Sequence, residues 1–405
     1  SFGPHLHMEV RLTETDEPVD PLLFYKDRVA DDVPPRASSI MLYVQQGRGL
    51  INGSSAKHFM EVKGNVIQTQ PITAWGKVGA GIAAYDYMTG THNYYGVQSV
   101  QLFVDDKLVS ESKVGRFVFD ENRQLDSWID YEERWRTGAW YMRSTVAPGN
   151  PLRMLKTYND DYGWVTINEE RDYRFRYELR DIYGNQATYR FIVRGKKETI
   201  PAEHTNYLFY MQAGKPHTIS WHDLTLWLPQ DALYEDLQLN VEEHDGHFQF
   251  CAVPTPLKEN AELRMQVPQP LVADKSKYCI AEVSGGGLSC LGGTYEYGWL
   301  KTTVSHLGAY AIMVDTIAPN VSAHQQASWP KSGEVAFKLG DWGSGISSYR
   351  ATIDGEWRLF KFSSKDMRLW CNLNDEHVAR GHHVVEVTVT DNCGNVTTRV
   401  EEFDW

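Results

Sequence analysis

Alternation of apolar and polar residues along most of the chain is the feature that most limits its fold. The segment 96–106 is one example, and such runs are bounded by Gly, Asn, Asp and Pro. An alternating run places its apolar side chains on one face of a strand, whereas a helix needs a repeat near 3.6 residues. Aromatic residues make up 12% of the chain and suit pleated sheet faces. The sequence therefore predicts an all-β protein.

An internal repeat indicates two copies of one kind of β domain. The string Asp181-Ile182-Tyr183-Gly184-Asn185 precedes an alternating strand, and Asp391-Asn392-Cys393-Gly394-Asn395 does the same near the chain end. An Asp side chain followed by Gly-Asn suits a tight turn that needs a positive φ. Two copies of this ending, each preceded by short strands, predict tandem immunoglobulin-like β-sandwiches.

Charge excludes some classes of partner. The 405 residues carry a formal net charge of −13 and no basic block, whereas a nucleic-acid binder needs clustered Lys and Arg to neutralise phosphates. No stretch of 18 or more apolar residues occurs, so no transmembrane helix is expected. We expect neither nucleic acid nor a membrane-spanning segment.

The five cysteines leave their role open. None forms a C-x-x-C pair, which argues against a thiolate zinc site. Cys279 and Cys290 flank three glycines, as in a hairpin, and Cys371 and Cys393 both lie in the last domain. Either pair could form a disulfide in an oxidising compartment.

One string near the N terminus has a catalytic pattern: Gly3-Pro4-His5-Leu6-His7-Met8-Glu9-Val10-Arg11. Residues i, i+2 and i+4 of a strand share a face, so the two imidazoles would lie side by side. One ring nitrogen can then bind a metal ion while the other acts on a water molecule or a substrate oxygen. A bare His-x-His pair is more commonly a solvated strand face.

The extended string resembles the signature of the M23 (lysostaphin-like) zinc metallopeptidases, with Met8 where Phe is more usual. Residues 15–23 resemble the P-x-x-P-L exit of that domain. The resemblance implies that His7 is a zinc ligand and that His5 is the catalytic imidazole. It also implies two further ligands, from an upstream H-x-x-x-D motif.

That motif is missing, because none of the 14 histidines has Asp four residues later. Catalytic zinc normally has three protein ligands. We therefore expect this chain to hold Zn²⁺ only weakly and to be inactive alone, lacking the N-terminal part of the peptidase domain. Strings such as "DYMTG" and "TDNCGN" are similar to the β-rich tail of M23 proteins in some Gram-negative bacteria, which implies a periplasmic or outer-envelope location.

Linkers rich in Pro and charge divide the chain. We expect a remnant of the M23 domain in 1–31, an immunoglobulin-like sandwich with a helical insertion in 32–199, a second sandwich in 200–317, and a C-terminal immunoglobulin-like sandwich in 318–405. Leu125, Trp128, Ile129 and Trp135 fit one helix face within 122–138, with Gly138 as its stop. A short helical turn is expected at 229–236.

Other polar clusters have ordinary structural explanations. His244-Asp245-Gly246-His247 is expected to be a surface turn. Asp341, Ser344 and Asp391 could line a calcium loop, but Asp-rich turns of sandwiches are more often capped by their own backbone. Tryptophans 75, 128, 135, 140, 221 and 299 could stack on sugars, but core packing is the default for Trp in β domains.

Two functions remain open. In the first, the chain is the β-domain tail of a zinc endopeptidase that cleaves peptidoglycan cross-link peptides. In the second, it is a non-catalytic adaptor or structural protein of the cell envelope that binds other proteins through its β-sandwiches.

Overall fold

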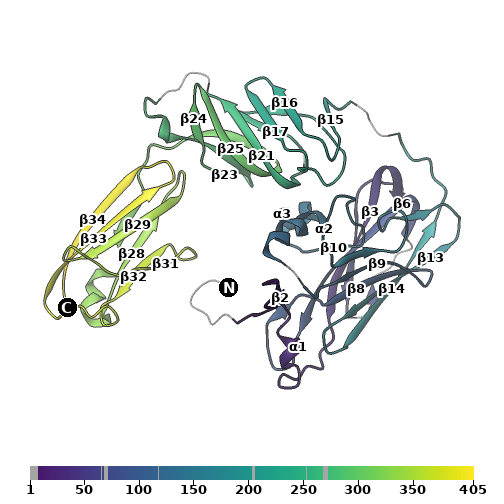
Figure 1. Ribbon diagram of the computed structural model, residues 1–405, viewed down its shortest axis with the longest axis horizontal. Helices are drawn as coiled ribbons and strands as arrows, with labels where there is room; N and C mark the ends of the chain where they lie inside the picture. The colour runs from purple at the N-terminus through teal and green to yellow at the C-terminus, as the bar shows by residue number, and fades with distance from the viewer. Residues whose placement is uncertain are drawn as a thin grey trace.

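The computed structural model describes residues 8–64, 66–67, 72–116, 118–202, 206–251, 253–267 and 272–405. Strands dominate, and three β units follow one another along an arc, from purple and blue through teal to yellow (Figure 1). The prediction of an all-β protein with tandem sandwich domains is confirmed. Among the described residues, no helix is long and apolar enough to cross a membrane.

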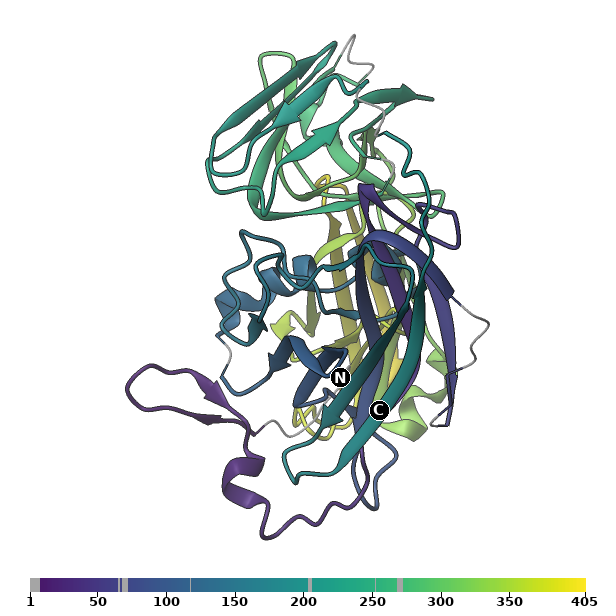
Figure 2. The same cartoon turned by 90° about the vertical axis from the view of Figure 1, so that its right-hand side faces the viewer.

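A small hairpin precedes the first β unit and projects from it (Figure 2). Strand β1 (Val10–Arg11) pairs with β2 (Pro18–Val19), and helix α1 (Leu22–Tyr25) follows. The hairpin is tied to the next domain because Arg153 Nη2 donates to Glu17 Oε1 at 2.9 Å and Val19 forms a bridge with Arg116.

The first domain is built on one sheet of 12 strands. Its strands are β3 (Arg36–Ile51), β4 (His58–Lys63), β5 (Val66–Ile67), β6 (Ile72–Tyr87), β7 (Tyr94–Tyr95), β8 (Ser99–Val104), β9 (Lys107–Lys113), β10 (Met142–Arg143), β11 (Leu155–Thr157), β12 (Val165–Ile167), β13 (Asp172–Arg180) and β14 (Gln186–Gly195). The main path runs β11-β9-β8-β13-β14-β6-β3-β4-β5.

This sheet folds over one core. Strand β14 pairs in parallel with β6, which joins the two halves of the sandwich into a continuous sheet. Register shifts in the β3–β6 ladder, at Ala37/Ser39 and Val44/Gly49, mark the bulges that let the long strands bend. Leu42, Val78, Leu102 and Tyr177 meet in the resulting core.

The helical insertion is not the single helix that periodicity predicts. It contains a 3₁₀ turn, η1 (Phe119–Gln124), and two short helices, α2 (Leu125–Trp128) and α3 (Tyr131–Thr137). Ile129 interrupts them with an extended ψ of 168° because it forms a bridge with Met142. Asp130 then caps α3 by accepting from Glu133 N–H, and Gly138 ends the helix at φ 78°.

The middle domain is a sandwich of two five-stranded antiparallel sheets, β16-β17-β21-β25-β24 and β19-β20-β26-β22-β23, with a two-stranded β15-β18 beside them. Its elements are β15 (Phe209–Met211), β16 (His217–Trp221), β17 (Leu224–Leu228), β18 (Leu237–Leu239), β19 (Glu242–His244), β20 (His247–Gln249), β21 (Thr255–Gln266), η2 (Lys275–Lys277), β22 (Tyr278–Ser284), β23 (Gly287–Cys290), β24 (Thr294–Glu296), β25 (Trp299–Leu307) and β26 (Ala309–Val314).

The expected helical turn at 229–236 is wrong. The segment is a non-helical turn whose Ala232 N–H donates to the Pro229 carbonyl. Ala232 and Leu233 are drawn into the core of the middle domain, and the Ala232 carbonyl accepts from Lys258 N–H. Tertiary packing therefore overrides the local preference.

The C-terminal domain is a sandwich of two four-stranded antiparallel sheets, β27-β28-β32-β31 and β30-β29-β33-β34. Its elements are β27 (Asn320–Ala323), η3 (Gln326–Ser328), α4 (Trp329–Ser332), β28 (Glu334–Gly340), β29 (Ile346–Ile353), β30 (Glu356–Trp357), β31 (Lys361–Ser363), β32 (Arg368–Asn372), β33 (His382–Asp391) and β34 (Val396–Asp404). Trp329, Phe337 and Leu369 lie in its core.

Hydrogen bonds join the three domains at their junctions. The insertion of the first domain reaches the middle domain, because Arg123 Nε donates to the Leu257 carbonyl at 2.8 Å. Gly149 N–H donates to the Tyr234 carbonyl at 2.8 Å across the same junction. At the other end, Lys277 Nζ donates to the Cys393 carbonyl at 2.9 Å.

Candidate functional site

A groove lies where the first domain meets the middle domain. Its volume is about 520 Å³. One side is lined by residues of β3, of the helical insertion and of 143–148, and the other by 233–237 and 254–256. Ligand sites commonly lie at domain interfaces in cavities of roughly this size.

Four residues that line this groove each contain a buried polar atom without a hydrogen-bond partner: Tyr43 Oη, Gln45 Oε1, Arg143 Nε and Thr145 Oγ1. Thr145 and Tyr43 are only 3% and 8% exposed. An unsatisfied buried polar group costs about 1–3 kcal/mol, so native proteins rarely leave such atoms unpaired. Four such residues around one cavity offer unused hydrogen-bonding capacity to a ligand.

Aromatic rings and Arg143 form one wall. The Arg143 guanidinium lies 5.1 Å from the ring centre of Tyr43 and 6.0 Å from that of Trp164. Burial raises the pKa of Tyr43, and the Asp130 carboxylate raises it further. The phenol therefore stays protonated at neutral pH and keeps an O–H to donate.

The charge of the groove is mainly negative. Its lining holds the carboxylates of Asp126, Asp130, Glu132, Asp161, Glu235 and Asp236, against the cations of Lys57 and Arg143. Lys57 is already shared between Asp130 at 3.1 Å and Glu132 at 3.0 Å. Burial lowers the pKa of Lys57, but these hydrogen bonds outweigh it and hold the pKa above its usual value. The arrangement suits an uncharged or amine-bearing ligand with hydroxyl or amide groups, and disfavours a polyanion.

The predicted zinc residues cannot be placed, because His5 and His7 lie outside the described residues. Of the string from Gly3 to Arg11, the structure describes only residues 8–11, of which Val10–Arg11 forms β1. Arg11 there binds Glu9 and Asp16, which are its own neighbours in the hairpin.

Two clusters of three carboxylates lie at equivalent places in the repeated domains. Asp31, Asp86 and Asp181 form one, and Asp315, Asp341 and Asp391 form the other, each with carboxylate oxygens within 4.8 Å of one another. The repeat deduced from sequence is thus reproduced in detail. Asn185 Nδ2 donates to Asp181 Oδ2 at 2.7 Å, and Asn395 Nδ2 donates to Asp391 Oδ2 at 2.7 Å.

The second cluster is capped by its own backbone, which is the alternative favoured over a calcium loop. Asp391 Oδ1 accepts from the N–H groups of Cys393 and Asn395, and Asp315 Oδ2 accepts from Ser344 N–H. Burial raises the pKa of Asp315, but its hydrogen bonds from Ser344 and Ile317 outweigh burial and leave the pKa below its usual value.

The cluster of Asp31, Asp86 and Asp181 has fewer hydrogen-bond donors to its carboxylates. Asp86 is only 9% exposed, and its Oδ1 has no hydrogen-bond partner. Burial, together with the charges of Asp181 and Asp31, raises the pKa of Asp86 to about 7, although the Tyr87 backbone N–H opposes the shift.

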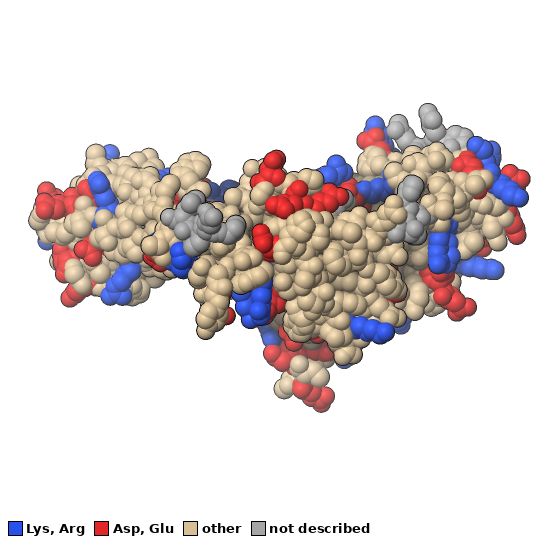
Figure 3. All heavy atoms as spheres, turned by 90° about the horizontal axis from the view of Figure 1, so that it is seen from above, with Lys and Arg blue, Asp and Glu red and all other residues tan. Residues whose placement is uncertain are grey.

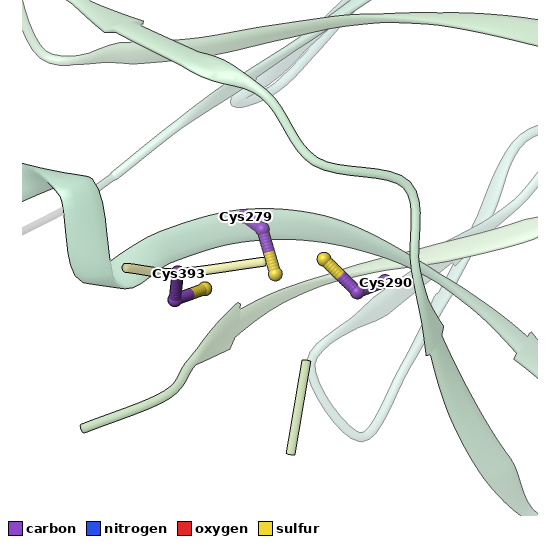
Figure 4. Close-up of side chains that lie close together, drawn as sticks. All are labelled: Cys279, Cys290 and Cys393. Carbon is purple, nitrogen blue, oxygen red and sulfur yellow. The ribbon is translucent and has the colours of Figure 1, made fainter. Parts of the chain in front are cut away.

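Three cysteines meet at the junction of the middle and C-terminal domains (Figure 4). The Sγ atoms of Cys279, Cys290 and Cys393 lie within 4.8 Å of one another. The structure therefore brings Cys393 beside Cys279 and not beside Cys371, which packs in the core of the C-terminal domain. Sequence spacing predicted no thiolate zinc site, because spacing does not reveal that Cys393 contacts Cys279 and Cys290, which lie far from it in the chain.

The remaining sequence candidates are ordinary surface or core features. His244 and His247 flank the β19–β20 turn and pair with each other in the ladder. Of the six tryptophans singled out, Trp128 is buried and Trp135 is exposed, and none lines the groove. Sequence reasoning missed Trp164 and Tyr43, because only the fold brings them beside 233–237.

Acidic and basic side chains are interspersed on the face seen in Figure 3, among large tan areas. Among the described atoms, that face shows no continuous area of Lys and Arg.

The Zu5-like domain family matches residues 209–315, which run from the start of β15 to the residue after β26. No curated protein matches the chain.

Among solved structures, a 1.5-MDa bacterial ice-binding adhesin is 10% identical, covering 81% of this chain and 90% of its own, with a TM-score of 0.14. The Bacteroides ovatus mixed-linkage glucan protein SGBP-B is 8% identical, covering 80% and 63%, with a TM-score of 0.14. A tetra-tandem repeat of a large adhesion protein is 10% identical, covering 93% and 92%, with a TM-score of 0.19.

Proposed function

We propose that this chain is a non-catalytic binding scaffold of the bacterial cell envelope, and that it holds peptidoglycan peptides in the groove between its first and middle domains. The observation that carries the proposal is that four residues lining one groove each contain an unpaired buried polar atom: Tyr43 Oη, Gln45 Oε1, Arg143 Nε and Thr145 Oγ1. A cross-link peptide supplies amide groups for these atoms and free amines for the surrounding carboxylates.

The envelope location and the choice of peptidoglycan rest on the resemblance of the segment 3–11 to M23 peptidases. Under this proposal, the three sandwiches position a peptidase domain on peptidoglycan. Three of the groove carboxylates form ion pairs with lysines: Asp130 and Glu132 with Lys57, and Asp161 with Lys77. This pairing favours a binding groove over a catalytic one.

The test is equilibrium binding of muramidase-released peptidoglycan fragments to the 405-residue chain. Thr145→Val removes one unpaired hydroxyl with little change of shape, and should weaken binding on the order of tenfold. Thr388→Val is the matched control, because Thr388 lies on β33 of the C-terminal domain and bonds to Thr398 at 3.0 Å. Absence of saturable binding, or equal affinity of the two variants, would overturn the proposal.

A second function, zinc endopeptidase activity, is favoured by one observation, the string Gly3 to Arg11. It requires His7 as zinc ligand and His5 as catalytic imidazole, completed by ligands from an H-x-x-x-D motif on another segment.

A further inference from the structure

We propose that Cys279, Cys290 and Cys393 bind one thiophilic divalent metal ion, with Zn²⁺ as the biological candidate, and that this ion fastens the C-terminal domain to the middle domain. Soft thiolate ligands select zinc-group ions over hard cations such as Mg²⁺ and Ca²⁺. This site is separate from the N-terminal histidine string and does not depend on the groove.

The three sulfur atoms converge from three segments. In the β22–β23 ladder Ala281 pairs with Cys290, so Cys279, two residues earlier, lies on the same sheet face and diagonal to Cys290. Cys393 reaches them from the turn after β33, and Figure 4 shows the Cys279 sulfur between the other two. Sulfurs that share a tetrahedral zinc at about 2.3 Å lie roughly 3.8 Å apart, so the observed limit of 4.8 Å requires only small side-chain rotations.

The surroundings hold this arrangement in place. Cys393 N–H donates to Asp391 Oδ1 at 2.9 Å, and Lys277 Nζ holds the Cys393 carbonyl against the middle domain. Gly292 N–H donates to Cys290 Sγ at 3.3 Å, and such a bond stabilises a sulfur that carries negative charge. Cys279 and Cys393 are 1% and 2% exposed, so water competes little for an ion there.

A bound metal ion accounts for the convergence of all three sulfur atoms, whereas a disulfide would join only two of them and leave the third thiol unbonded beside it. Without an ion, burial raises the pKa of the Cys279 and Cys393 thiols, so these groups stay protonated. Binding of Zn²⁺ forms three S–Zn bonds and releases three protons to solvent, with no change of oxidation state. A water molecule can complete the fourth position.

Because two ligands belong to the middle domain and one to the C-terminal domain, the ion links the two folds. Binding to the native junction alone stabilises that junction by mass action. The expected consequence is an orientation of the last domain that is more firmly fixed than the hydrogen bonds from Lys277 to Cys393 and from Asn395 to Asp315 achieve without the ion.

The test is titration of the reduced, metal-free 405-residue chain with Cd²⁺, followed by the ultraviolet sulfur-to-cadmium charge-transfer band, and with Zn²⁺ in competition with a chelating dye. We expect one ion per chain. Loss of a residue that only hydrogen-bonds to a metal ligand already lowers metal affinity by about 10–100-fold, so loss of a ligand itself in Cys279→Ser should weaken binding by more than about 100-fold. Cys371→Ser, which removes a buried thiol outside the cluster, should bind one ion with unchanged affinity.

Cys290→Ser is a second variant for the same titration. Cys290 is only partly buried, so its replacement disturbs the packing less than the replacement of the buried Cys279 does. It should also lose the charge-transfer band while circular dichroism shows an unchanged fold. The proposal is overturned if the reduced chain takes up no stoichiometric ion, or if both serine variants bind as tightly as the unchanged chain. A Cys279–Cys393 disulfide found by peptide mapping of the non-reduced protein would also overturn it.

Discussion

Tyr43 and Tyr177 are both buried in the first domain, but only Tyr177 has a partner for its hydroxyl group. The Tyr177 and Ser144 hydroxyl oxygens lie 2.6 Å apart, whereas Tyr43 Oη is unpaired in the groove. Removal of an unpaired hydroxyl relieves a desolvation cost, and removal of a paired one strands its partner.

We therefore expect opposite results from two matched substitutions. Tyr43→Phe should leave the free energy of unfolding unchanged or raise it by up to about 1 kcal/mol, and Tyr177→Phe should lower it by about 1–3 kcal/mol. Urea unfolding of both variants measures the difference. A Tyr43→Phe variant that is as destabilised as Tyr177→Phe would mean that the Tyr43 hydroxyl is already satisfied in the free protein.

Asp86 predicts a specific pH dependence. Its native pKa is raised from 3.8 to about 7, first by burial and then by Asp181 and Asp31. Between these pH values the native state holds a proton that the unfolded state has lost, so the free energy of unfolding falls as pH rises through this window. Asp86→Asn removes the cost of ionising this buried carboxyl group. The variant should therefore be more stable than the unchanged chain at pH 8, and the difference in stability should shrink toward pH 4.

Asp315→Asn is the control for that experiment, because the Asp315 pKa is lowered and the sign reverses. Its charge stabilises the native state above the unfolded pKa of 3.8. Asp315→Asn should be less stable than the unchanged chain at pH 8. This loss of stability should disappear as the pH falls below 3.8. Thermal melts across the range report both trends, and parallel behaviour of the two variants would contradict the assignment.

At the scale of elements, the sequence was most informative where local geometry decides the structure. The Asp-x-x-Gly-Asn turns at 181–185 and 391–395 were predictable because Gly184 and Gly394 need φ values of 95° and 72°. The insertion was predicted as one helix because periodicity does not reveal that Ile129 leaves the helix to pair with Met142.

Gly149 controls how closely the first and middle domains approach. A Cβ at this position would lie 2.5 Å from the Tyr234 carbonyl oxygen, to which Gly149 N–H now donates. Gly149→Ala should separate the two domains and widen the groove, which raises the radius of gyration in small-angle X-ray scattering. Gly115→Ala, where a Cβ meets nothing within 4 Å, should leave the scattering unchanged. Equal scattering of both variants would show that the junction does not depend on this contact.

At the scale of the whole molecule, the candidate sites depend on contacts that sequence order hides. The groove combines residues near 43, 145 and 234, and the thiol cluster combines 279, 290 and 393. No local pattern links such positions, because each comes from a different strand or turn. The histidine string, by contrast, was recognisable from its sequence alone and remains a prediction.

The incomplete zinc site leads to a prediction about activity. The 405-residue chain has no H-x-x-x-D motif, so with Zn²⁺ added it should release no new amino groups from purified peptidoglycan. His5→Ala should behave in the same way as the unchanged chain. Zinc-dependent cleavage that disappears in His5→Ala would contradict this expectation and restore a catalytic role to the chain itself.

Binding of peptidoglycan peptides in the interdomain groove can be tested by hydrogen–deuterium exchange with and without muramidase-released peptidoglycan fragments. We expect slower exchange at 43–46, 145–148 and 233–237, which line the groove from both domains, and unchanged exchange in the C-terminal sandwich at 320–404. Protection confined to other segments, or none at saturating fragment, would contradict it.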